Sequence, residues 1–229
     1  MAQEGNNQAE SKMHKVMQAL KRSRGIVENG YAGNPEILAR VKDYEQRSAA
    51  SDQSPQSAVR PDDLDRLALL DPLTELHSHR AFLKELRAEL KRAARYKYEI
   101  AMCMFNVDGF EGVIQQYGQL TGDAVLKVVA NVLKGSRSEN DIATVYGAPV
   151  FAWAMPKTSL SSAALIAEKV RQKIGNQAIT HNWQNFSVTT SIGIASFPDH
   201  AHEYDELIAR ATEVMEQAIE RGGDRVIVV

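Results

Sequence analysis

Residues 141–155 read DIATVYGAPVFAWAM, and this stretch decides the class of fold. Two apolar runs, ATV and VFAWAM, flank a short segment that contains a glycine and a proline. Apolar runs on both sides of such a segment are typical of a β-hairpin. We expect Gly147 and Ala148 to form a two-residue type II′ turn, with the glycine at its first central position. The stretch therefore predicts two paired strands in the middle of the chain.

Helical periodicity appears on both sides of this hairpin. It is strong over residues 79–96, and it recurs in GDAVLKVVANVLKGS, SLSSAALIAEKVRQKI and EYDELIARATEVMEQAIERG. A further helix is expected to begin in RPDDLDRLALLDPLTEL, because proline and acids are common in the first helical turn. The runs EIAMCMFNV, FSVTTSIGIASF and RVIVV are typical of buried strands. The pattern predicts one α+β domain over residues 61–229, with helices flanking a central sheet.

Residues 1–60 differ in composition from the rest of the chain. Residues 1–11 are polar and are expected to be disordered, whereas two short helices are expected within residues 12–46. A Ser-rich linker, RSAASDQSPQSAVR, follows at residues 47–60. Two short helices bury too little surface to fold alone. The segment is therefore either a loosely held tail or an element for docking or dimerisation.

The bulk composition excludes several classes of protein. The chain is 44% hydrophobic, and it has a net charge of −2 and a pI of about 6.3. This charge balance argues against binding to nucleic acid or to an anionic membrane. No apolar run approaches the length of a membrane span, and the N-terminus lacks the apolar core of a signal peptide. We therefore expect a cytoplasmic protein.

Several motifs in the second part of the chain follow one another in the order of a known family. DPLTELHSHRAF resembles D-x-L-T-G-L-x-N-R-R-x-F, and YGAPVF stands where the signature Y-G-G-D/E-E-F belongs. FNVDGFEGVIQQYGQLTGDAVL, SIGIASFP and LIARATEVMEQAIERGGDRV match three further motifs. Residues 66–229 thus resemble the GGDEF domains, the diguanylate cyclases. The resemblance implies the palm-like fold of nucleotidyl cyclases, with a central five-stranded sheet.

The resemblance also implies a reaction, in which two GTP molecules are joined across a homodimer with the help of carboxylate-bound metal ions. The family's first metal-binding aspartate is Asn106 in this chain, although Asp108 is kept. The two acids of the signature are Pro149 and Val150, and its second glycine is Ala148. An amide and two apolar side chains are poor ligands for Mg²⁺. We therefore expect no metal site, no cofactor and no cyclase activity, so that the chain would not be an enzyme.

Most of the other positions that carry a functional residue in the family are also replaced in this chain. A phosphate-binding lysine is Glu111, and a guanine-binding asparagine is Ile114, whereas a second guanine contact remains as Asp123. Two late phosphate-binding cations are Ile219 and Gly223. The Gly and the Asn of the opening motif are Glu75 and Ser78.

A set of charged residues could still bind a ligand. The family's product-binding motif is R-x-x-D, and here Asp141 takes the aspartate position while Ser138 takes that of the arginine. Arg137 lies one residue earlier, and Lys169 follows in the next predicted helix. Together with Asp123, these are the candidate ligand-binding residues. The alternative is that they are solvated surface charges.

Two functions are left open by the sequence. The first is a catalytically inactive regulatory or scaffolding protein of bacterial signalling, which acts through protein contacts. Its contact surfaces would be residues 12–46 or the hairpin at residues 147–151, and a second copy of the chain is among the expected partners. The alternative is an effector that binds cyclic di-GMP or GTP without cyclase activity.

Overall fold

The computed structural model describes residues 69–181 and 184–229, and within them five strands form a mixed sheet in the order β2-β3-β1-β6-β7. The strands are β1 (Ile100–Val107), β2 (Ile142–Gly147), β3 (Val150–Pro156), β6 (Thr190–Phe197) and β7 (Val226–Val228). β1 lies at the centre and pairs antiparallel with β3 and β6, while β7 pairs parallel with β6. The sheet confirms the predicted α+β fold.

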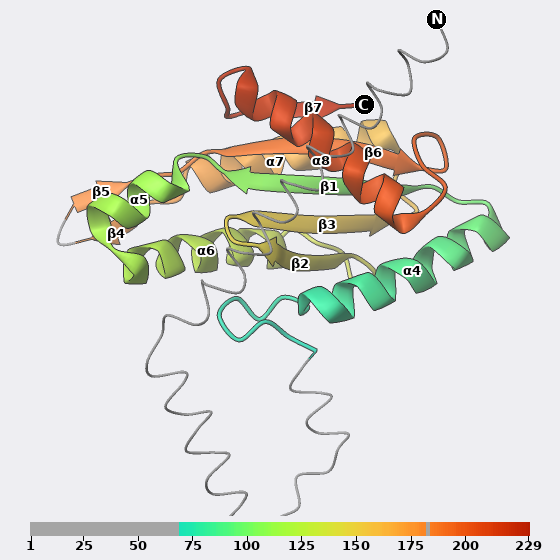
Figure 1. Cartoon of the computed structure of the whole chain (residues 1–229), viewed down its shortest axis with the longest axis horizontal. Coiled ribbons are helices and arrows are strands. Elements are labelled where there is room, and N and C mark those ends of the chain that lie inside the picture. Colours follow the sequence, from blue (N-terminus) through green and yellow to red (C-terminus); the bar gives the residue numbers. More distant parts are fainter. Residues whose placement is uncertain (1–68, 182–183) are drawn as a thin grey trace, which may run out of the picture. The chain divides into compact units, whose positions relative to one another are not determined.

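Helices cover both faces of the sheet. They are α4 (His79–Tyr96), α5 (Phe110–Tyr117), α6 (Gln119–Lys134), α7 (Leu160–Gly175) and α8 (Tyr204–Glu220). One buried cluster joins α5, α6 and α7 to the sheet, and a second joins α4 and α8 to it. Figure 1 shows α8 passing in front of β6, with α7 behind it. The sheet is thus the middle layer between two layers of helices.

The central strand β1 contributes to both clusters. Cys103 and Phe105 belong to the cluster under α5–α7, whereas Met102 and Met104 belong to the one under α4 and α8. Side chains alternate between the two faces of a strand, and here both faces are covered. This explains why the strand reads as an uninterrupted apolar run in the sequence.

Helix α4 begins and ends as its sequence predicts. The Ser78 hydroxyl accepts a hydrogen bond from the backbone N–H of Ala81, which satisfies one free donor of the first turn. The helix ends at Lys97, whose φ of 59° is left-handed. Phe82, Leu86 and other apolar residues of the predicted stripe are buried against the sheet. The prediction of a helix over residues 79–96 is confirmed.

The hairpin forms, but with a different turn. Gly147 pairs with Val150, so the loop consists of Ala148 and Pro149, which are joined by a cis peptide bond. Gly147 is not among the residues with positive φ, as a type II′ turn at Gly147–Ala148 would require. The predicted turn is therefore wrong, because the ladder continues through Gly147 and places the loop one residue later.

Three further features depart from the sequence prediction. Helix α5 was not expected, and neither was the small antiparallel pair formed by β4 (Ile179–His181) and β5 (Gln184–Phe186). Residues 69–78 form turns and a bridge rather than the expected helix. There the Asp71 carboxylate accepts hydrogen bonds from the N–H and the hydroxyl of Thr74, which closes a turn. The rest of that predicted helix and the whole of residues 1–60 lie outside the described residues.

Candidate functional site

The end of β1 brings the signature hairpin and the first acidic motif together. Asn106 pairs with Val150 on β3 on one side and with Ser191 on β6 on the other. The amide of Asn106 donates to the carbonyl of Val107 at 3.2 Å. The N–H of Val107 in turn donates to the carbonyl of Pro149 at 3.3 Å. The four substituted motif positions, Asn106 and residues 148–150, therefore form one corner of the domain.

Asp108, the acid that is kept, joins three segments of the chain. Its carboxylate accepts hydrogen bonds from the hydroxyls of Ser191 and Thr189, both at 2.7 Å. It also accepts one from the backbone N–H of Asp224 at 3.1 Å, in the loop after α8. A side chain at Gly223 would approach this carboxylate to 3.3 Å. Asp108 thus ties the end of β1 to the start of β6 and to the C-terminal loop.

The hairpin tip is an apolar corner that is partly exposed. Residues Gly147–Val150 are all half-buried. Tyr146 and Val150 pack against the cluster under α4 and α8, while Ala148 packs against the other cluster. The Tyr146 ring meets the His79 ring edge to face, with the centroids 4.7 Å apart. Burial, and then the nearby phenol of Tyr204, raise the pKa of Tyr146, so this hydroxyl stays neutral.

Of the charged residues predicted to bind a ligand, Asp141 lies at the end of β2 opposite to the tip. It is buried, and its carboxylate accepts hydrogen bonds from the N–H and the hydroxyl of Ser138 at 2.9 and 2.6 Å. The indole N–H of Trp153 donates to it at 3.1 Å. These contacts attach the loop that precedes β2 to strand β3. A ligand at Asp141 would therefore have to replace them.

Arg137 lies in the same loop as Asp141 and is half-buried. Helix α7 approaches this loop, since the Lys173 ammonium donates to the Ser136 hydroxyl at 3.3 Å. Lys169 lies one turn earlier on α7 and is exposed. The structure therefore brings Arg137 and Asp141 into one loop and places α7, which carries Lys169, beside it.

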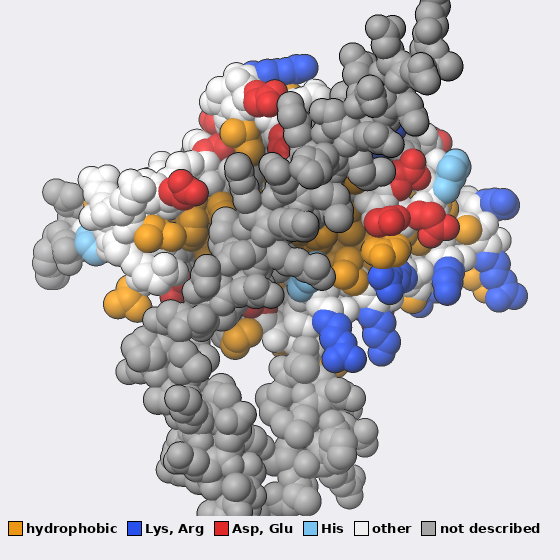
Figure 2. Space-filling model, viewed as in Figure 1, with side chains coloured by type: hydrophobic (Ala, Val, Ile, Leu, Met, Phe, Trp, Pro, Cys, Tyr) orange, Lys and Arg blue, Asp and Glu red, His pale blue; other side chains and the backbone are white. Residues whose placement is uncertain are grey.

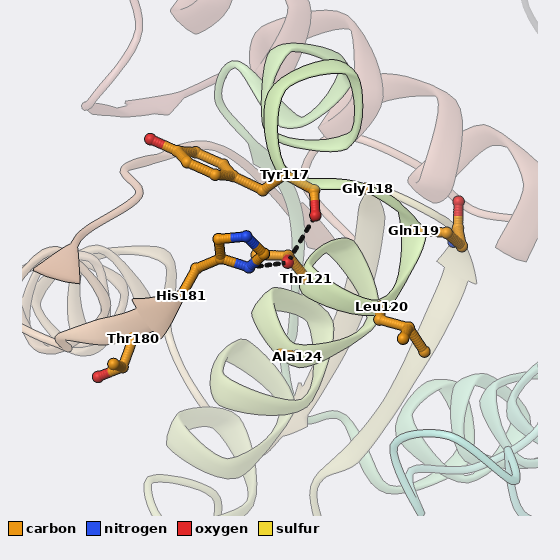
Figure 3. A pocket seen from close by; sticks show the side chains of 8 residues that line it. All are labelled: Tyr117, Gly118, Gln119, Leu120, Thr121, Ala124, Thr180 and His181. Atoms are coloured by element: carbon orange, nitrogen blue, oxygen red, sulfur yellow. Dashed lines mark hydrogen bonds between the residues drawn. The ribbon is translucent and has the colours of Figure 1, made fainter. Parts of the chain in front are cut away.

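Asp123 lies elsewhere, beside a hollow at the junction of α5 and α6. The hollow has a volume of about 440 Å³ and is lined by Tyr117, Gly118, Gln119, Leu120, Thr121, Ala124, Thr180 and His181 (Figure 3). The Gln119 amide donates to the Asp123 carboxylate at 2.9 Å. The Thr121 hydroxyl is 2.7 Å from Nδ1 of His181, whose ring lies against that of Tyr117. This volume is within the range of small-molecule sites.

No group of three or more His, Cys, Asp or Glu side chains within residues 69–181 and 184–229 has the arrangement of a metal site. Carboxylates and imidazoles do occur near the corner, but each has another role. Asp108 is bonded to hydroxyls and a backbone N–H, and His79 packs against Tyr146. These contacts hold the corner together.

The motif order, the mixed sheet and the position of the hairpin agree with one known family. The model of the family described as "Diguanylate cyclase, GGDEF domain" matches residues 68–225. The chain belongs to the GGDEF family. The match covers most of the chain and includes every strand of the five-stranded sheet except β7.

Curated relatives of this GGDEF protein come from several bacteria. Diguanylate cyclase A of Treponema denticola is 26% identical over 172 residues, which are 74% of this chain and 46% of that protein. Response regulator PleD of Caulobacter vibrioides is 30% identical over 194 residues, 84% of this chain and 42% of that protein. The chain thus spans less than half the length of these relatives.

Solved GGDEF structures share the fold. The GGDEF domain of DgcB from Caulobacter crescentus, in complex with c-di-GMP, has a TM-score of 0.67 at 25% identity and covers 70% of this chain and 95% of its own. Diguanylate cyclase SiaD of Pseudomonas aeruginosa, in complex with its activator SiaC, has a TM-score of 0.68 at 26% identity. That alignment covers the whole of this chain and 79% of SiaD.

The expectation that the chain is not an enzyme is contradicted by these comparisons. The matching family is one of enzymes, and relatives such as diguanylate cyclase A and DgcP of Pseudomonas aeruginosa are named as cyclases. The expectation was drawn from the number of replaced motif positions. Phosphoryl transfer depends on the summed positioning and electrostatics of many groups, whose contributions are not additive. Such a number therefore does not determine activity.

The structure also reveals partners that the sequence analysis missed. Thr189, Ser191 and Asp224 all bind Asp108, although they lie far from it in the chain. Asp224 belongs to the segment ERGGDRV, in which the family resemblance implies a role for the position of Gly223 but not for Asp224. Within the described residues, no helix is long and apolar enough to cross a membrane.

Proposed function

We propose that this GGDEF protein acts in cyclic di-GMP signalling through contacts with other proteins, and that the hairpin tip at residues 147–151 is one contact surface. The observation that carries the proposal is the chemistry of the tip, which is partly exposed and has no charged side chain. Apolar side chains of this kind form the centres of protein interfaces. The crystallised complex of SiaD with its activator shows that a related GGDEF protein has a protein partner.

Site-specific photo-crosslinking in the native cell tests this proposal. A photoreactive residue at Ala148, which is half-buried at the tip, should crosslink the full chain to another protein. The control position is Asn176, an exposed residue at the end of α7. A crosslinked product from Ala148 and none from Asn176 supports the tip as a contact surface. The same pattern from both positions, or none from Ala148, overturns it. Deletion of residues 12–46 in the same cells measures how much of the crosslinking to another protein depends on the N-terminal segment.

A second candidate function is the binding of cyclic di-GMP or GTP. The observation that favours it is the hollow at the junction of α5 and α6, which is lined by the rings of Tyr117 and His181 and by Gln119, the hydrogen-bond donor to Asp123. Aromatic walls with a few polar groups suit a purine base. The DgcB domain has been crystallised with c-di-GMP, which makes this dinucleotide the first ligand to examine.

Calorimetric titration with c-di-GMP and with GTP, each with Mg²⁺, tests nucleotide binding. If the hollow binds the base, Tyr117→Ala and Asp123→Ala should each weaken binding by about tenfold or more. If Arg137 and Lys169 bind the phosphates instead, Arg137→Ala and Lys169→Ala should do so. Chromatography of the GTP mixture distinguishes binding from turnover. Heat changes that none of the four variants alters would exclude both groups of residues.

A further inference from the structure

Helix α4 carries a row of exposed cations along one side. The row consists of Arg80, Lys84, Arg87, Lys91 and Arg95, spaced three or four residues apart, as residues on one helical face are. With six Lys and Arg residues against two glutamates, the helix has a net charge of +4. No member of the row forms an ion pair with another residue in the described part of the chain. We call this row the α4 basic band.

Helix α8 carries the opposite charge. Its exposed acids are Asp205, Glu206, Glu213, Glu216 and Glu220, and with Arg210 as its one cation the helix has a net charge of −4. Partial burial, and then the like charges of Glu220 and Glu213, raise the pKa of Glu216. The acids therefore repel one another along the helix. We call this set the α8 acidic band.

The two bands lie on the same face of the domain. Helices α4 and α8 cover one face of the sheet and share its buried cluster. They touch where the Arg87 guanidinium lies 4.1 Å from the centre of the Tyr204 ring and donates to its hydroxyl. Figure 2 shows cations gathered along α4 and acids beyond them over α8. A two-fold rotation about an axis that runs between the bands generates a second copy of the domain. The α4 basic band of each copy then lies opposite the α8 acidic band of the other.

We propose that this face binds a second copy of the chain, with the α4 basic band of each copy against the α8 acidic band of the other. Such a contact is isologous, because the same surface serves both partners. Charge complementarity favours this arrangement, and it relieves the repulsion within each band. On α8, Ile219 is 40% exposed and lies between Glu216 and Glu220 in the chain, so it adds an apolar side chain beside the α8 acidic band. The proposal does not depend on the hairpin tip.

Charge reversal in the full chain gives a direct test by sedimentation over the micromolar range. The α4-reversed variant is Lys84→Glu with Lys91→Glu, and the α8-reversed variant is Glu213→Lys with Glu216→Lys. Each alone should weaken self-association by at least about tenfold, because both contacts of its homodimer become repulsive. An equimolar mixture of the two variants should restore association, since both contacts are then attractive. Added salt should weaken the wild-type dimer, because it screens exposed charges.

The controls keep the outcomes separate. Lys127→Glu with Lys173→Glu changes the net charge by the same amount as the α4-reversed variant, but on α6 and α7, and it should leave association unchanged. Circular dichroism verifies that each variant folds, and Lys84→Ala with Lys91→Ala replaces any reversal that does not. A wild-type chain that stays monomeric overturns the proposal, as does a mixture that fails to restore association. A monomeric chain that instead binds phosphatidylserine vesicles, with binding lost on Lys84→Glu and Lys91→Glu, would assign the basic band to a membrane.

Discussion

At the scale of single residues, Gly193 shows how closely β6 and α8 approach each other. A side-chain carbon at this position would lie 2.2 Å from the carbonyl of Ala211 and 2.2 Å from the N–H of Met215. Both are backbone atoms of a helix and cannot move independently. We expect Gly193→Ala to lower the free energy of unfolding by about 3 kcal/mol or more. Urea denaturation monitored by circular dichroism measures the change.

A matched glycine provides the control. Gly112 lies inside α5 and is exposed, and no atom lies within 4 Å of the position of an added carbon. Gly112→Ala should therefore raise stability by about 0.5–1 kcal/mol, through the lower entropy of the unfolded chain. Equal effects of the two substitutions would contradict the close packing of β6 against α8 at Gly193.

Tyr98 provides a prediction for alkaline pH. Burial, and then its hydrogen bond to Glu89 at 2.6 Å, raise the pKa of Tyr98 to about 12 from an ordinary value of 10.0. The phenol ionises first in the unfolded chain, so its contribution to stability is complete below pH 10 and is lost as the pH rises toward 12. At neutral pH, Tyr98→Phe should cost about 1.5–3 kcal/mol, because the Glu89 carboxylate loses a donor.

The pH dependence distinguishes this from a general packing defect. The difference between wild type and Tyr98→Phe should shrink above pH 10, since only the wild type loses this contribution. Denaturation curves between pH 7 and the highest pH at which the protein remains folded measure it. A difference that stays constant with pH would mean that the hydrogen bond to Glu89 does not control the stability.

Residue identity predicted only part of the site. The sequence comparison marked Glu75 as a replaced glycine, and the structure gives the physical reason for the glycine, since Glu75 has a φ of 59°. Asp108 was identified from its motif, but its role as a link between three segments was not. A hydroxyl at Thr189 or Ser191 has no sequence pattern that points to a carboxylate about eighty residues away. Such partners follow from the sheet register, which single-sequence patterns do not determine.

At the scale of elements, Asp108 links the end of β1 to the loop that leads into β7. The carboxylate is the acceptor for the N–H of Asp224. We expect Asp108→Ala to increase amide hydrogen exchange at Asp224 and its neighbours by about tenfold or more, because a hydrogen bond to a charged group is lost. Exchange in α4 should not change.

Glu111 provides the matched control for this experiment. It is an exposed acid in the first turn of α5, close to Asp108 in the chain. Glu111→Ala removes the same charge without removing a hydrogen bond to the C-terminal loop. Slow exchange at Asp224 in both variants would show that the loop is held by other contacts, for example by the pair between Arg171 and Asp224.

Most of the predicted elements are longer and bury more apolar residues than the elements that the sequence did not predict. Helix α4 has 18 residues and a clear apolar stripe, and its bounds were predicted from that stripe. Helix α5 has eight residues and buries only Phe110, so it has too few apolar residues to show a period. Strands β4 and β5 have three residues each, which is too short for alternation to be visible. Short elements are stabilised by tertiary contacts rather than by their own pattern.

At the scale of the whole molecule, the net charge conceals the distribution of charge. The chain has a net charge of −2, from 27 cations and 29 acids, and this balance by itself argues against binding to nucleic acid or to an anionic membrane. Yet α4 carries +4 and α8 carries −4 on one face of the sheet. Composition sums over the chain, whereas an interface depends on which helices share a face. The fold therefore creates a charged surface that no composition value indicates.

A variant that inverts residues in both bands separates the effect of the charge pattern from that of the net charge. A single chain that carries Lys84→Glu, Lys91→Glu, Glu213→Lys and Glu216→Lys has the same net charge as the wild type, but two residues are inverted in each band. In its homodimer the altered residues of α4 still face opposite charges on α8. We expect this variant to self-associate within about threefold of the wild type, although either pair of changes alone weakens association by about tenfold or more. Sedimentation at matched ionic strength measures all three. Association that falls further in the fourfold variant than in either double variant would show that the two bands do not meet.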